Sequence, residues 1–120
     1  MSKLGDKLRA ARESWETAGG VQFLVRRPTG LQIAQWSMLN KVEIIPKVVV
    51  GWRREDGTPL QEMDILPSGD PHPVTFDADV LMEWVGDNSS MFMALVDRID
   101  VALLRAAQAN EDAAKNSTSS

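Results

Sequence analysis

The chain has 120 residues, of which 43% are hydrophobic and 25% are charged, and its formal net charge is −4. This length suits one domain, and this composition excludes disorder of the whole chain. The absence of cysteine excludes disulfides, thiolate catalysis and the usual zinc sites. Because the chain is acidic and has neither a long apolar run nor a signal-peptide core, we expect a cytoplasmic protein that binds neither nucleic acid nor a membrane.

The first predicted element is a short helix within residues 3–14. Leu4, Leu8 and Ala11 have the spacing of one helix face, although Gly5 weakens the helix.

A strand is predicted directly after a glycine pair. In "VQFLVRR", residues Val21, Phe23 and Val25 alternate with other side chains, which is typical of a strand with one buried face. The strand ends in two arginines, and a helix begins soon after it. Thr29, behind Pro28, is the candidate N-cap of that helix.

The middle of the chain is ambiguous between strand and helix. Residues 41–52 are rich in β-branched side chains, which favours a strand, whereas Pro46 would also suit the first turn of a helix. The sequence "EDGT" at residues 55–58 predicts a turn more strongly than a complete hairpin. Residues 66–73, "LPSGDPHP", predict a loop.

Two further helices are predicted in the last third of the chain. Thr75 or Asp77 can cap a short helix that ends with Gly86 in a left-handed C-cap. Asn88 or Ser89 then opens a longer helix with a core-facing stripe. The stripe consists of Phe92, Leu95, Val96, Ile99, Ala102, Leu103 and Ala106.

These elements predict a mainly α protein with a small β element near the N-terminus. We expect a compact helical domain over residues 1–109, followed by a flexible polar tail over residues 110–120, where apolar anchors are missing.

The residue types that carry catalysis do not assemble into a site. His72, the only histidine, lies between two prolines, where a general base would have no rigid support. Asp97 and Asp100 are one helical turn apart, but no histidine or third carboxylate completes a metal shell beside them. We therefore expect no enzyme, no metal and no cofactor.

Protein binding is the remaining class of function. Strand-end arginines can meet an acidic partner, large aromatic residues can anchor an interface, and methionine suits either gap filling or an adaptable surface. Buried packing is the competing interpretation for the aromatic residues and methionines. The candidate protein-binding residues are Arg26, Arg27, Trp36, Trp52, Met91, Met93 and Leu104.

The order of several segments resembles the tail assembly chaperones of long-tailed phages and prophages. The segments are "VQFLVRRPT", "LQIAQWS", "VVVGWRREDGTPL", the Pro-rich loop, "FDADVLMEWV" and a terminal helix with an Ala, Asn, Lys and Ser tail. The resemblance covers roughly residues 15–116.

This resemblance implies a chaperone that coats the tape measure protein in the host cytoplasm and is displaced as tail tube subunits polymerise. It also implies a homo-oligomer, as a ring or spiral, and a helical "IPKVVVGW" segment. Family members often have a longer frameshifted form, and Ala114-Lys115-Asn116 could be encoded by a slippery string. The alternative hypothesis is a small adaptor or regulatory protein that binds one folded partner.

Overall fold

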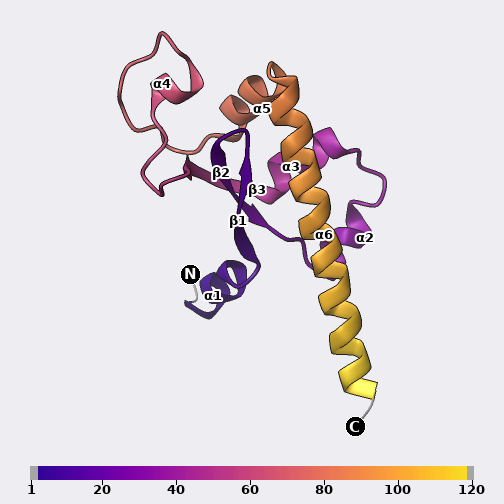
Figure 1. The fold of residues 1–120 in the computed structure, drawn as a ribbon. Coiled ribbons are helices and arrows are strands. Elements are labelled where there is room, and N and C mark those ends of the chain that lie inside the picture. The colour runs from indigo at the N-terminus through magenta and orange to yellow at the C-terminus, as the bar shows by residue number, and fades with distance from the viewer. Residues whose placement is uncertain (1–2, 119–120) are drawn as a thin grey trace.

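The structure, a computed structural model, describes the backbone of residues 3–118 and the side chains of residues 3–105, 107 and 108. This part of the chain consists of helices and the three strands of one antiparallel sheet (Figure 1). The elements are α1 (Lys3–Ala10), β1 (Glu13–Ala18), β2 (Val21–Arg26), α2 (Gly30–Gln35), α3 (Lys41–Val48), β3 (Val49–Arg54), α4 (Glu62–Ile65), α5 (Ala78–Gly86) and α6 (Ser89–Thr118).

The fold is mixed α/β, so the prediction of a mainly α fold is wrong. The sheet has the order β1-β2-β3, and both outer strands pair antiparallel with β2. Gly19 and Gly20 both have positive φ, and they join β1 to β2 by a tight turn with Ala18 opposite Val21. This conformation is what a two-residue hairpin requires. The predicted helix over residues 3–14 is therefore too long, because residues 13 and 14 belong to β1.

The ambiguous segment contains a helix and then a strand. Asn40 caps α3 by accepting a hydrogen bond from the backbone N–H of Glu43 at 3.0 Å. Ile45 and Val48 are fully buried on one side of α3, which lies against β3, α5 and α6. The cap and this burial outweigh the β propensity, so the predicted strand is wrong for residues 41–48 and right for residues 49–52.

One face of the sheet forms the core with α3, α5 and α6. Val21, Phe23 and Val25 point into this core, as their alternation predicts. On the other face, Trp15 is 37% exposed, and the Arg53 guanidinium lies 3.8 Å from its ring centre.

The helix caps are largely those that the sequence indicates. Thr29 and Gln32 form a reciprocal capping box at the start of α2. The Asp77 carboxylate accepts hydrogen bonds from two backbone N–H groups at the start of α5. Gly86 lies within α5 and has no positive φ, so its predicted left-handed C-cap is wrong. The predicted turn at residues 55–58 is confirmed, with the Gly57 N–H bonded to the Arg54 carbonyl.

Helix α6 gives the molecule its length. Its stripe residues Leu95, Ile99 and Ala102 are buried, as predicted. The helix then continues beyond the globular part (Figure 1), and the chain measures 59 × 32 × 24 Å. The backbone of residues 110–118 is helical where the sequence predicts a mobile tail; the side chain of Ala106 and those of residues 109–120 lie outside the described part.

Candidate protein-binding surfaces

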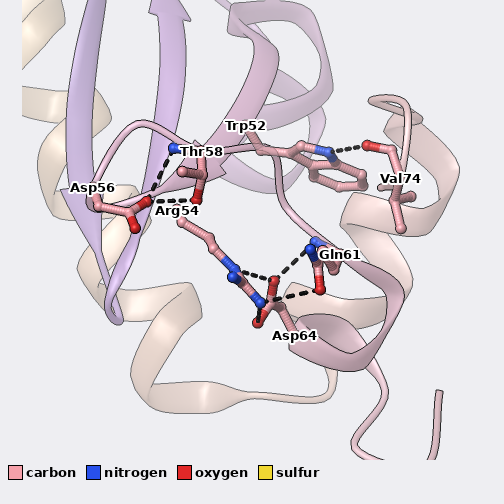
Figure 2. Close-up of polar contacts among 7 residues, drawn as sticks. All are labelled: Trp52, Arg54, Asp56, Thr58, Gln61, Asp64 and Val74. Atoms are coloured by element: carbon pink, nitrogen blue, oxygen red, sulfur yellow. Dashed lines mark hydrogen bonds and ion pairs between the residues drawn. The ribbon is translucent and has the colours of Figure 1, made fainter. Parts of the chain in front are cut away.

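Helix α4 is held against the rest of the molecule by polar contacts (Figure 2). The Arg54 guanidinium donates to both carboxylate oxygens of Asp64, at 2.8 and 3.1 Å, and Asp64 also accepts the backbone N–H of Gln61. The Trp52 indole N–H donates to the Val74 carbonyl at 3.0 Å. Hydrogen bonding from Arg54 lowers the pKa of Asp64 below its ordinary value of 3.8, so this attachment is fully charged at neutral pH.

Beside this attachment, Ile65 at the end of α4 and the adjacent Leu66 form one wall of a groove that faces α5, which we call the α4–α5 groove. Its volume is about 560 Å³. Apolar side chains and two carboxylates line it; of the described lining residues, none is basic. The lining consists of Ile65, Leu66, Val80, Glu83, Trp84, Asp87, Asn88 and Ser89.

The charge of the α4–α5 groove comes from Glu83 and Asp87. These two residues are four apart at the end of α5, so their side chains lie on the same side of the helix. Both also line a second hollow beside Met82 and Gly86. Leu66 is 54% exposed at the groove. The groove therefore has an apolar floor with two negative charges beside it.

Helix α1 has the opposite character. Leu8 is 60% exposed and Leu4 is 65% exposed, and none of the residues of α1 is buried. The helix carries Lys3, Lys7 and Arg9 against a single acidic residue. It therefore presents a leucine ridge with basic side chains on both sides.

A second surface surrounds α6 where this helix leaves the globular part. Here residues 11–14, at the junction of α1 and β1, lie beside Ala102 and Arg105, and α2 lies beside Leu103; we call this region, with the hollow beside α1, the end surface. Three adjoining hollows follow one another around it. Arg12 and Arg27 line the first two, and Ile33, Trp36 and Leu103 line the third.

The two strand-end arginines lie near the end surface and are half-buried. Arg26 forms an ion pair with Glu13 at 3.3 Å, and its Nε is buried without a hydrogen-bond partner. Arg27 lines the hollows beside Leu8 and Ala102. Pairing with Glu13 engages Arg26 within the chain, so Arg27 is the better placed of the two for a partner.

Three further candidates lie at the surface. Trp36 is half-buried in the end surface, with the Lys47 ammonium 5.8 Å from its ring centre. Met93 and Leu104 are 65% and 59% exposed on α6. Their separation of eleven residues places them on the same outer side of the helix, with Asp100 and its ion pair to Lys41 between them.

Trp52 and Met91 are buried instead. Trp52 packs edge-on against Phe76 and Trp84. Met91 is 5% exposed, and its side chain lies against Gly19 in the hairpin turn. Both side chains therefore act in the core, and the structure does not present them as binding residues.

His72 is exposed in the loop, where its carbonyl accepts the backbone N–H of Glu62. Within the described part of the chain, no group of three His, Cys, Asp or Glu residues could hold a metal ion. In the same part, no helix is both long enough and apolar enough to span a bilayer.

Sequence reasoning missed the α4–α5 groove because its walls come from separate segments. Ile65 and Leu66 line it from the α4 side, and Val80 and Trp84 line it from α5. The leucine ridge of α1 was visible as Leu4 and Leu8 at helical spacing, but a spacing pattern alone does not show whether another element covers the ridge.

Comparison with known proteins gives no match to a family model, to a curated protein or to a solved structure.

Proposed function

We propose that this protein is a non-enzymatic phage tail assembly chaperone that binds and solubilises the tape measure protein in the host cytoplasm. It acts as a self-associating, multi-copy scaffold and gives way to tail tube subunits as the tube forms. The proposal rests on the sequence resemblance together with one structural observation, the end surface, where exposed apolar side chains surround an emerging helix.

The physical argument concerns helix binding. A long apolar helix is kept in solution when its apolar stripe is covered by other apolar side chains. The end surface offers Ile33, which is 39% exposed, and the half-buried Trp36 and Leu103 in one hollow. Leu31 and Met38, on α2 and just after it, are 70% and 93% exposed. Apolar exposure of this extent is typical of a surface that binds a partner.

Co-expression with a candidate tape measure protein tests the proposal. We expect a soluble complex that contains several copies of this chain, measured by light scattering and by the amount of client in the supernatant. A wild-type chain that leaves the client insoluble and binds a single folded protein would overturn the proposal and favour the adaptor hypothesis.

Matched variants locate the contact. Ile33→Glu places charge in the third hollow of the end surface, and we expect the amount of soluble client to fall about tenfold or more. Met63→Glu is the control, because Met63 is also exposed, at 45%, but lies on α4. If both variants reduced the amount of soluble client equally, the result would contradict client binding at the end surface.

A further inference from the structure

We propose that copies of this chain associate head to tail by docking the basic leucine ridge of α1 into the α4–α5 groove of the next copy. The inference rests on the self-association in the proposed function and names the two surfaces that carry it. Four observations support it: complementary charge, equal spacing, the exposure of α1 and the distance between the two surfaces within one chain.

Charge complementarity is the first observation. The ridge of α1 carries Lys3 and Lys7 beside the leucines, and the α4–α5 groove carries Glu83 and Asp87 beside its apolar floor. Burying apolar surface drives such an association, and the opposite charges fix the partner and the register.

The spacing of the charges agrees with this docking. Lys3 and Lys7 are four residues apart on one helix, and Glu83 and Asp87 are four residues apart at the end of another. Each pair is separated by about 6 Å along its helix axis. Two helices laid side by side can therefore pair both lysines with both carboxylates while Leu8 contacts the floor of the groove.

The exposure of α1 indicates that it needs a partner. The helix has eight residues, none of them buried. Isolated helices shorter than about 12–15 residues are marginal in water. An apolar groove that covers the leucine ridge would stabilise α1 by packing.

The same chain cannot supply the ridge to its own groove. Strand β1 runs from Glu13, just after α1, to Ala18 at the hairpin, where Gly19 lies against Met91 near the start of α6. The six residues of β1 extend over about 20 Å. Figure 1 accordingly places α1 and α5 at opposite ends of the sheet. A contact between different surfaces of successive copies builds open filaments or closed rings.

Cysteine cross-linking tests the contact directly, because the chain has no cysteine of its own. Lys7→Cys in one chain and Asp87→Cys in a second chain of different tag length are mixed under mild oxidation. We expect a disulfide-linked product that contains both tags. Lys47→Cys mixed with Asp87→Cys is the control, since Lys47 lies on α3 and is also exposed.

Charge reversal completes the test by sedimentation velocity. Lys3→Glu with Lys7→Glu, or Glu83→Lys with Asp87→Lys, should weaken self-association about tenfold or more. A chain that carries both double substitutions should regain self-association. Circular dichroism checks that each variant is folded.

The outcomes separate the inference from the proposed function. A wild-type assembly that persists in both reversed variants, or that gives equal cross-linking in the control pair, overturns this contact and leaves the chaperone proposal standing. A wild-type chain that stays monomeric yet keeps its client soluble also overturns the contact. A monomer that fails to bind the client overturns both.

Discussion

Phe23 on β2 and Leu8 on α1 are both large apolar residues near the start of the chain, and they differ in what covers them. Phe23 is fully buried against Trp84, whereas Leu8 is 60% exposed. The buried face of β2 around Phe23 is covered by α5 and α6, whereas Leu8 lies at an open hollow beside Arg27 and Thr29. The spacing of apolar residues therefore indicates which face of a helix or strand favours burial. The tertiary structure decides whether another part of the same chain buries that face.

The largest expected effect comes from the core side of this comparison. Phe23→Ala should lower the free energy of unfolding by about 3–5 kcal/mol, because it removes a buried ring and leaves a cavity. Leu8→Ala, the matched change on the exposed ridge, should stay within about 0.5 kcal/mol in dilute solution. Urea denaturation followed by tryptophan fluorescence measures both. A similar loss in the two variants would show that α1 belongs to the core.

A smaller effect is expected where α4 and its loop attach to the core. Trp52→Phe removes the indole donor and leaves the Val74 carbonyl without its protein partner. We expect a loss of about 1–3 kcal/mol in the free energy of unfolding. In the Trp52→Phe variant, amide hydrogen exchange should also be faster in residues 60–74 than in β2. Equal exchange rates in these two regions of the variant would show that the loop does not depend on the Trp52–Val74 hydrogen bond.

The hairpin turn gives the next effect. Gly19→Ala and Gly20→Ala both place a side chain at positive φ, which costs about 1–2 kcal/mol. Gly19→Ala should cost more, because its new Cβ would lie 3.0 Å from the Met91 side chain, whereas Gly20 has open space. Gly30→Ala is the control, since Gly30 begins α2 without positive φ. Thermal unfolding would rank the stabilities of the three variants. Equal unfolding midpoints would contradict the need for glycine in the hairpin turn.

The smallest effect concerns the ion pair that fixes α4. Hydrogen bonding from Arg54 lowers the pKa of Asp64 below 3.8, so the pair stabilises the fold above that pH and loses its contribution as the pH falls through the lowered value. Asp64→Asn should therefore be slightly less stable than wild type at neutral pH and equal to it in acid below that pKa. Urea titrations between neutral pH and acid test this difference, and a gap that widens in acid would contradict it.

Local signals predicted much of the fold. The Thr29 and Asp77 caps, the alternation in β2 and the stripe of α6 depend on residues close in sequence, and the structure confirms each of them. Strand β1 escaped prediction because "ESWETA" has only two buried positions, Glu16 and Ala18, and one of them is polar. Its pairing with β2 depends on the turn at Gly19 and Gly20, which places residues 13–18 opposite residues 21–26.

The candidate surfaces were predictable only in part. Met93 and Leu104 are exposed on α6, whereas Met91 is buried on the same helix. The helical pattern alone left core and surface roles open for Met91 and Met93. Contact with Gly19 decides the role of Met91, and that contact joins residues far apart in the chain.

The sequence by itself determined the N-caps of α2 and α5, the buried face of β2, the core stripe of α6 and the helical spacing of Leu4 and Leu8 in α1, because each is a pattern within a few residues. Only the tertiary structure decided that residues 41–48 are helical, that α4 and α5 enclose an acidic apolar groove, and that α1 lies at the opposite end of the sheet. Those features depend on burial and on ion pairs between distant segments, which local propensity does not contain.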